Sequence, residues 1–329
     1  MKRTLKRKPS LGFVFVLTFI LMTTKKLVQV DWAKSKTYSN PEEELPSTEN
    51  PAFAPKSNSI YFHDTSHIGG LTPRQACSVE SAARVHPRQD VYVLFSSHVA
   101  EDTLKASCLA KLREFPNVKF LRINISEHSK GTAVQSILNN LKGSIFRMQY
   151  AADMLKILTL YKWGGICVET DMIMINSLQN LPANWIVQQY DMYVATGIMS
   201  FAANEVGRNI TKAILEEIKK TYKPNESYST GEIPIRRAIQ RICPKRIHWD
   251  TCVDIGILPY EKFFPIRNIL WSREFKIATY QPNYSFRIWN ALSDIMYNYD
   301  EHYMYQNNEA LAKKYCPSIY LLYRDELNL

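Results

Sequence analysis

The sequence lacks several features that would each indicate a particular class of protein. None of its six cysteines belongs to a Cys-x-x-Cys pair, so a structural zinc site is not expected. No acidic residue occurs among the first 26 residues, whose lysines and arginines supply +7 of the net charge of +10. The rest of the chain carries only +3, which removes the main support for nucleic-acid binding. With 46% hydrophobic residues, the chain is not disordered throughout.

The apolar run near the N-terminus is short. Residues 11–24 would rise about 21 Å as a helix, less than the roughly 30 Å of a bilayer core, although Lys25 and Lys26 could snorkel and residues 27–32 could prolong the span. Five basic residues precede the run and no small-x-small cleavage site follows it, which favours a retained signal anchor over a cleaved signal peptide. We therefore predict a cytosolic tail over residues 1–9, an anchor over 10–32 and a lumenal location for the rest.

The next segment is rich in proline and poor in apolar residues. Residues 33–57 are predicted to form a stem, and residues 58–329 a single lumenal domain. The cysteines fit an oxidising compartment, and Cys243 and Cys252, which bracket a proline-containing loop, form the simplest disulfide to predict. Cys167 is expected to remain a free thiol, and the other pairings stay open. Four N-glycosylation sequons begin at Asn124, Asn209, Asn225 and Asn283.

Strand-like and helical stretches alternate after residue 58. Runs of β-branched and aromatic residues predict strands over 59–63, 91–95 and 118–123, and helical patterns lie between them, from residue 72 and over 103–114. This alternation predicts an α/β fold with a mostly parallel central sheet. In such sheets, ligands bind beyond the carboxyl ends of the strands.

Two carboxylates follow one of these strands. A helical pattern over 146–162 ends at Gly164-Gly165, a short apolar strand follows, and Glu169 and Asp171 come directly after it. Residues i and i+2 of a strand point to the same side, so these side chains can converge on a divalent cation that also holds phosphate oxygens. Taken alone, the pair also fits solvated charge at a strand end. Its position at the ligand edge of the predicted sheet favours a function.

Several stretches between residues 58 and 318 resemble one family of enzymes in composition and order. They are Ile60-Tyr61-Phe62, Asp64-Thr65-Ser66, residues 77–83 with His86-Pro87, Phe115-Pro116-Asn117-Val118, Asp153, residues 162–166, Glu169-Thr170-Asp171, Gly231, Arg237, Cys243, Trp289-Asn290 and Tyr315-Cys316-Pro317. The sequence resembles the α1,4-glycosyltransferases of the lactosylceramide α1,4-galactosyltransferase and α1,4-N-acetylglucosaminyltransferase type. That resemblance implies a GT-A fold, a Rossmann-like nucleotide-diphospho-sugar transferase domain, in a Golgi type II membrane protein.

The resemblance also implies a chemistry. A UDP-sugar would donate Gal, GalNAc or GlcNAc in α1,4 linkage, with retention of configuration, to a β-linked sugar acceptor, often on a glycolipid. A divalent metal such as Mn²⁺ would stabilise the departing UDP as a Lewis acid. Asp171 and Glu169 fall on the metal-binding Asp-x-Asp motif and, with Asp153, are the candidate catalytic residues. Asp153 also falls among the candidate donor-binding positions, together with Asp64, Thr65, Glu80, Lys156, Gly165 and Arg287.

Several of these positions depart from the family pattern. Glu169 replaces an aspartate, Lys156 replaces an arginine, and Arg287 replaces a histidine that could ligate the metal, although an arginine has no lone pair to offer. Further departures are Ala152, Cys167 and Glu232. In one interpretation, Arg287 contacts the diphosphate and partly substitutes for the charge of the metal. In a second, the chain is a weak or inactive relative that binds sugar, UDP or a partner protein. In a third, it is a structural membrane protein without a nucleotide site.

Overall fold

The computed structural model describes residues 45–189, 193–243, 252, 254–264, 284–287 and 309–327. The predicted cytosolic tail, the anchor over 10–32, the sequon at Asn283 and the Trp289-Asn290 motif lie outside these residues. Within the described part of the chain, no helix is both long and apolar enough to cross a membrane. Part of the predicted stem is described and lies against the domain, because Ser47 bridges Arg122 and the Phe53 ring contacts Tyr92 and Trp163. These residues belong to the folded unit that begins at Glu44.

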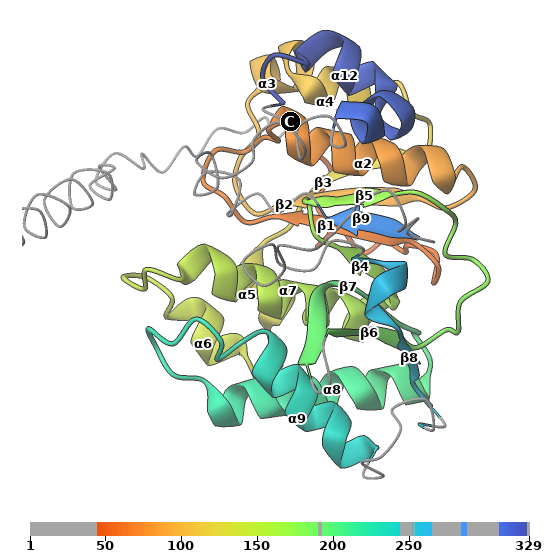
Figure 1. The fold of residues 1–329 in the computed structure, drawn as a ribbon. Coiled ribbons are helices and arrows are strands. Elements are labelled where there is room, and N and C mark those ends of the chain that lie inside the picture. Colours follow the sequence, from red (N-terminus) through yellow and green to blue (C-terminus); the bar gives the residue numbers. More distant parts are fainter. Residues whose placement is uncertain are drawn as a thin grey trace, which may run out of the picture. The chain divides into compact units, whose positions relative to one another are not determined.

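The centre of the fold is a seven-stranded sheet in the order β3-β2-β1-β4-β7-β6-β8 (Figure 1). All of its strands run parallel to one another except β7, which is antiparallel to both of its neighbours. The prediction of an α/β fold with a mostly parallel sheet is therefore confirmed. The strands are β1 (Ile60–Asp64), β2 (Val91–Phe95), β3 (Val118–Arg122), β4 (Gly165–Val168), β6 (Trp185–Gln189), β7 (Tyr193–Phe201) and β8 (Gly256–Leu258).

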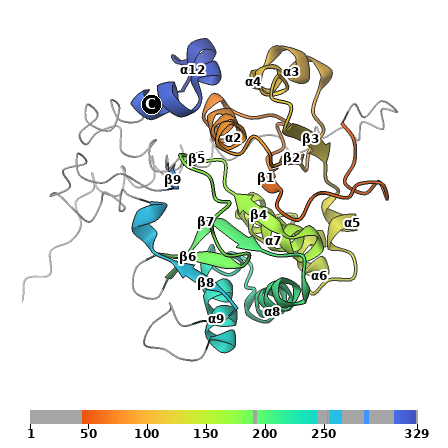
Figure 2. The ribbon, with the colours of Figure 1, turned by 90° about the vertical axis from the view of Figure 1, so that its right-hand side faces the viewer.

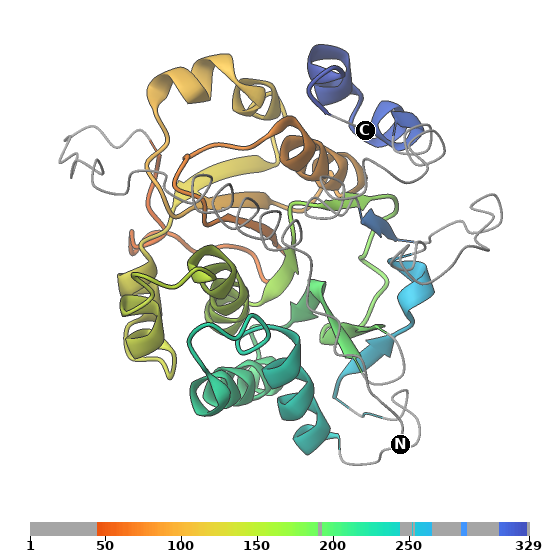
Figure 3. The same cartoon turned by 60° about the vertical axis from the view of Figure 1, so that its left-hand side comes forward.

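Helices cover both faces of the sheet (Figures 1 and 3). Each face has its own cluster of buried apolar side chains, as expected for a parallel sheet that is hidden from water on both sides. One face carries α2 (Pro73–Val85), α3 (Glu101–Ala106), α4 (Cys108–Leu112) and α12 (Pro317–Tyr323). The other face carries α5 (Ile125–Ser129), α6 (Gln135–Asn139), α7 (Arg147–Trp163), α8 (Glu205–Thr221) and α9 (Glu232–Ile242). Residues 309–315 are also helical, and η3 (Tyr260–Lys262) is a short 3-10 turn.

The two glycines after α7 are needed for backbone geometry. Gly164 and Gly165 have φ angles of +67° and +103°, which side-chain-bearing residues rarely adopt. A Cβ atom on Gly164 would lie 2.3 Å from the Ala203 nitrogen, and one on Gly165 would lie 2.4 Å from the Ser59 carbonyl oxygen. The pair therefore lets the chain turn sharply from α7 into β4 and brings β4 close to the start of β1.

Two disulfides are present. Cys243 pairs with Cys252, as predicted, and Cys77 pairs with Cys316, which joins α2 to the start of α12. In the described part of the chain, Cys108 and Cys167 are buried free thiols, and Cys167 Sγ donates to the Lys156 carbonyl oxygen over 3.5 Å. The expectation that Cys167 is unpaired is confirmed.

A buried histidine makes the stability of the fold depend on pH. The His86 ring is fully buried, with Nδ1 3.0 Å from the Ala82 carbonyl oxygen and Nε2 3.0 Å from the Leu178 amide nitrogen. The amide can only donate, so Nε2 accepts and the ring is neutral. Burial lowers the pKa of His86 to about 4, although the hydrogen bond to Ala82 opposes the shift.

Acidification is therefore expected to destabilise the protein through His86. Between about pH 6.5 and pH 4, the unfolded chain binds a proton at this residue that the folded chain does not, so stability falls as the pH falls. From pH 7 to pH 5, the expected loss is about 2 kcal/mol. Urea denaturation of the wild type and of His86→Gln at both pH values checks this. The variant should lose less free energy of unfolding from pH 7 to pH 5 than the wild type does. An equal loss in the two proteins would contradict the prediction.

Candidate active site

The candidate site lies where β4 ends. Glu169 and Asp171 follow β4 at its carboxyl end, and the chain continues into β5 (Met172–Met174). β5 pairs antiparallel with β9 (Ser285–Arg287), and this two-stranded sheet lies outside the main one (Figure 2). In this ladder, Met172 is the partner of Arg287, so the backbone brings Arg287 next to the two carboxylates.

Arg287 bridges the two carboxylates. Its Nε donates to Asp171 Oδ2 over 2.9 Å, and its Nη2 donates to Glu169 Oε2 over 2.6 Å. The other oxygen of Glu169, Oε1, lies 2.5 Å from Lys156 Nζ. Both oxygens of Glu169 are therefore bound to cationic groups.

Lys156 connects this pair to a third carboxylate on α7. Its Nζ lies 3.4 Å from Asp153 Oδ1 and 3.2 Å from the Thr196 carbonyl oxygen. Asp153 Oδ2 accepts from Thr230 Oγ1 over 3.0 Å. We call Asp153, Lys156, Glu169, Asp171 and Arg287 the charge cluster.

The members of the charge cluster are largely hidden from water. Their side chains are between 5% and 25% exposed, with Lys156 the most buried. Three carboxylates and two cations give the cluster a formal charge of −1. Buried charges of this kind rarely improve stability over apolar residues of the same size, which favours a functional explanation.

Burial and neighbouring charges shift the two motif carboxylates in opposite directions. Burial alone would raise the pKa of Glu169, but the positive charges of Lys156 and Arg287 together hold it well below its ordinary value. For Asp171, burial outweighs the attraction of Arg287, and Glu169 also repels its charge, so the pKa of Asp171 is raised. Asp171 Oδ1 is buried and has no hydrogen-bond partner among the described residues.

Helix α2 holds the motif segment in place. Ser78 Oγ donates to the Thr170 carbonyl oxygen over 2.7 Å, and Gln75 Nε2 donates to Thr170 Oγ1 over 3.3 Å. One turn further along α2, Ser81 Oγ accepts from the Met174 amide over 2.9 Å. These positioning residues were not predicted, although the polar side chains at 75, 78 and 81 recur with the three-residue spacing of one helix face.

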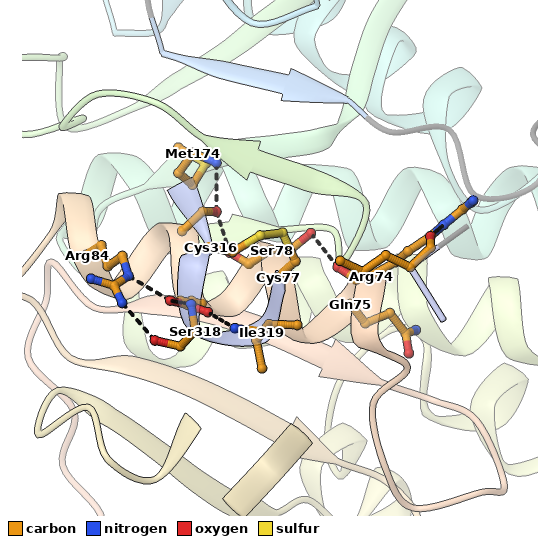
Figure 4. The surroundings of a disulfide bond; sticks show 12 residues. Arg74, Gln75, Cys77, Ser78, Arg84, Met174, Cys316, Ser318 and Ile319 are labelled. Atoms are coloured by element: carbon orange, nitrogen blue, oxygen red, sulfur yellow. Dashed lines mark hydrogen bonds and ion pairs between the residues drawn. A yellow bond between two sulfur atoms is a disulfide. The ribbon is translucent and has the colours of Figure 1, made fainter. Parts of the chain in front are cut away.

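The same helix is fixed at its other side to the C-terminal region (Figure 4). Cys77 is bonded to Cys316, and the fully buried carboxylate of Glu80 accepts from the Ser318 and Ile319 amides over 3.0 and 2.8 Å. Glu80 also pairs with Arg84 over 2.7 Å. Glu80 was predicted to contact the donor, but the structure places it at the start of α12 and outside the charge cluster.

The other predicted donor-binding positions divide into two groups. Asp64 and Thr65 lie at the carboxyl end of β1, which is parallel to β4, so they share the edge of the sheet with Glu169. Asp64 accepts from the Ser66 amide and hydroxyl, each over 3.1 Å, and Thr65 Oγ1 donates to the Met148 carbonyl oxygen over 3.0 Å. Gly165, in contrast, opens β4 at the opposite edge of the sheet, and its close contact with Ser59 accounts for the glycine.

The charge cluster as arranged does not fit a divalent metal ion. Such an ion would need carboxylate oxygens of Glu169 and Asp171, but three of those four oxygens already accept from Lys156 or Arg287. Only Asp171 Oδ1 has no partner among the described residues. Within this part of the chain, no group of three or more histidine, cysteine, aspartate or glutamate side chains is arranged to hold a metal. The Arg287 guanidinium joins these two carboxylates instead.

Comparison with known proteins places these features in a family. The family model described as "Glycosyltransferase sugar-binding region containing DXD motif" matches residues 72–191, and the one described as "Alpha 1,4-glycosyltransferase conserved region" matches residues 203–323. Human lactosylceramide 4-alpha-galactosyltransferase is 25% identical over 300 residues, which are 86% of this chain and 84% of that protein. Human alpha-1,4-N-acetylglucosaminyltransferase is 23% identical over 280 residues, 79% of each chain.

Among solved structures, the PaToxG glycosyltransferase is similar with a TM-score of 0.47 and 15% identity, over 58% of this chain and 71% of that one.

The two family models together span most of the folded unit. The first contains Asp153, Lys156, Glu169 and Asp171, and the second contains Arg287. The chain belongs to the α1,4-glycosyltransferase family.

Proposed function

We propose that this chain is a retaining hexosyltransferase with a GT-A fold. It transfers Gal, GalNAc or GlcNAc from a UDP-sugar in α1,4 linkage to a β-linked sugar of a glycan, in the first place a glycolipid. The observation that carries the proposal is the charge cluster, in which residues from α7, the β4–β5 turn and β9 meet at the carboxyl edge of a mostly parallel sheet. Family membership gives the reaction class, and this edge is where such sheets bind nucleotides.

The charge cluster offers what a departing nucleotide needs. When the bond between the sugar and UDP breaks, negative charge grows on the diphosphate, and fixed positive groups close to it lower the barrier. Lys156 and Arg287 are such groups, and each is held by carboxylates that keep it oriented. Asp171 Oδ1 is a buried acceptor that is available for a hydrogen bond from a hydroxyl group of the ribose or of the sugar. These side chains bind and orient the donor before the transfer.

The acceptor and the location are also part of the proposal. Relatives that match 86% of this chain carry lactosylceramide in their names, which supports a glycolipid acceptor here. Together with the basic N-terminus and its apolar run, this supports a single-pass type II protein of the Golgi membrane with the transferase domain in the lumen.

Turnover of UDP-sugars tests the proposal. The full-length chain, purified in detergent, is incubated with UDP-Gal, UDP-GalNAc or UDP-GlcNAc and with lactosylceramide or free lactose, each with Mn²⁺ and with EDTA. We expect one donor to give UDP release and a glycosidic product with α configuration by NMR. Asp171→Asn is the expected inactive variant, and Asp102→Asn, on the exposed side of α3, is the matched control.

Two outcomes would count against the proposal. UDP binding without transfer from any of the three donors would instead support a protein that binds nucleotide or sugar but does not catalyse transfer. Absence of UDP binding with both Mn²⁺ and EDTA would show that the charge cluster is not a nucleotide site.

A further inference from the structure

We infer that Arg287 is a built-in cation that takes the place of a divalent metal, so that this chain binds its sugar nucleotide without metal. The inference rests on the proposed function, because it concerns how the same site holds the diphosphate. It goes beyond that function by assigning the charge that faces the diphosphate to two side chains.

The backbone places Arg287 beside the two carboxylates. Arg287 is the last residue of β9, and the ladder with β5 pairs it with Met172, directly after Asp171. Next to it, Phe286 is only 6% exposed, and Ser285 Oγ donates to the Phe263 carbonyl oxygen over 3.1 Å. The strand therefore fixes the backbone of Arg287 beside Asp171, and the two hydrogen bonds to Asp171 and Glu169 hold the guanidinium between the carboxylates.

The surroundings leave room for this guanidinium. Gly197 on β7 faces the charge cluster, and a Cβ atom there would lie 3.2 Å from Arg287 Nη1 and 3.4 Å from Glu169 Oε2. A larger side chain at 197 would press against the group that bridges the carboxylates. Glycine at this position is therefore matched to an arginine at 287.

Charge and protonation argue against a metal beside Arg287. A guanidinium does not lose its proton in proteins, so it cannot become a ligand or make way by turning neutral. A divalent ion between Glu169 and Asp171 would have to displace it and would then be repelled by it at close range. Lys156 and Arg287 together already bring two positive charges to Glu169, the same total as one divalent ion.

The chemistry of the two cations also suits a diphosphate. Arginine carries five N–H donors in a planar fork that matches phosphate as well as carboxylate geometry, and those of Arg287 on Nε and Nη2 already reach Asp171 and Glu169. The buried Lys156 ammonium, which already contacts Glu169, Asp153 and the Thr196 carbonyl oxygen, contributes its charge. A site of this kind would keep affinity for UDP when divalent ions are removed. Metal dependence is therefore the property that separates it from a metal-bridged site.

Calorimetry of UDP binding tests the inference in the full-length wild type, in EDTA and in Mn²⁺. We expect dissociation constants that agree within about two-fold. Arg287→His removes the cation and offers a nitrogen ligand instead, so UDP should bind at least ten-fold more weakly in EDTA and recover in Mn²⁺. Arg287→Lys keeps a charge and should remain independent of metal. Electron paramagnetic resonance of Mn²⁺ with UDP present should show tight binding to Arg287→His and none to the wild type.

The outcomes separate this inference from the proposed function. Wild-type binding that requires Mn²⁺, or is ten-fold tighter with it, would overturn the inference and leave the proposed function standing. Arg287→His that binds UDP in EDTA as well as the wild type does would also overturn it. Absence of UDP binding in every condition would overturn the proposed function itself. If Arg287→His fails to fold, as judged by circular dichroism, the wild-type comparison and its Mn²⁺ spectrum still decide the question.

Discussion

Replacement of Lys156 by methionine is expected to lower the free energy of unfolding by about 3–5 kcal/mol. The side chain is only 5% exposed, and its ammonium contacts the carboxylates of Asp153 and Glu169. Methionine fills a similar volume but leaves Asp153 without a cationic partner and Glu169 with Arg287 alone. Removing one partner from a buried ion network costs far more than removing a surface pair, because the remaining charges stay out of water. Urea denaturation near pH 7 measures the change.

An exposed lysine provides the control for this substitution. Lys212→Met, on the solvent side of α8, should change stability by no more than about 0.5 kcal/mol. If Lys156→Met were as mild as Lys212→Met, the ammonium would not be paired with buried carboxylates as described. Circular dichroism at 222 nm should confirm that both variants fold.

Removal of the Cys77–Cys316 disulfide is expected to destabilise the protein by about 5 kcal/mol. The bond closes a loop with a sequence separation of 239, so its loss frees a very large part of the unfolded chain. It also releases α2 from the C-terminal region, although Glu80 still holds the start of α12. The double variant Cys77→Ser with Cys316→Ser, compared with the wild type by thermal and urea denaturation, measures the effect.

The second disulfide is a matched control for loop length. Cys243 and Cys252 are separated by only 9 positions, so the chain-entropy model gives their double serine variant a loss about 3 kcal/mol smaller. Equal losses from the two double variants would contradict the loop-length explanation. UDP affinity should fall in the Cys77/Cys316 variant only, because α2 positions Thr170 through Ser78.

Local patterns in the sequence predicted the sheet and part of the site. The alternation of strands and helices was enough to predict β1, β2 and β3 and a mostly parallel sheet, since each pattern reflects burial along a short stretch. The spacing of Glu169 and Asp171 placed both carboxylates at one strand end. Cys243 and Cys252 are close enough along the chain for their pairing to be predicted.

Contacts between distant segments could not be predicted from local sequence patterns. The bridge from Arg287 to Asp171 and Glu169 depends on the β5–β9 ladder, whose strands have three residues each and no distinctive pattern. The pairing of Cys77 with Cys316 depends on how α12 lies over α2. Both contacts join segments that are more than 100 residues apart in the sequence, so no local pattern indicates them.

Family resemblance marked positions without explaining them. Gly165 and Glu80 both occur in stretches that resemble the family, and both were expected near the donor. The structure gives Gly165 a role in close backbone packing and gives Glu80 a role as acceptor for the first amides of α12. A family motif therefore contains residues that maintain the fold as well as residues that bind the ligand. The motif alone does not show which role a given residue has.

The late position of Arg287 in the chain has a consequence for synthesis. The ribosome makes Asp171 and Glu169 116 and 118 residues before Arg287, which corresponds to about 6–24 s of translation at typical rates. During that time, the nascent chain holds three carboxylates of the charge cluster with only Lys156 to balance them. This edge of the sheet is therefore expected to stay hydrated and open until the last fifth of the chain emerges, and a chain released early would lack both the bridging arginine and the partner of Cys77.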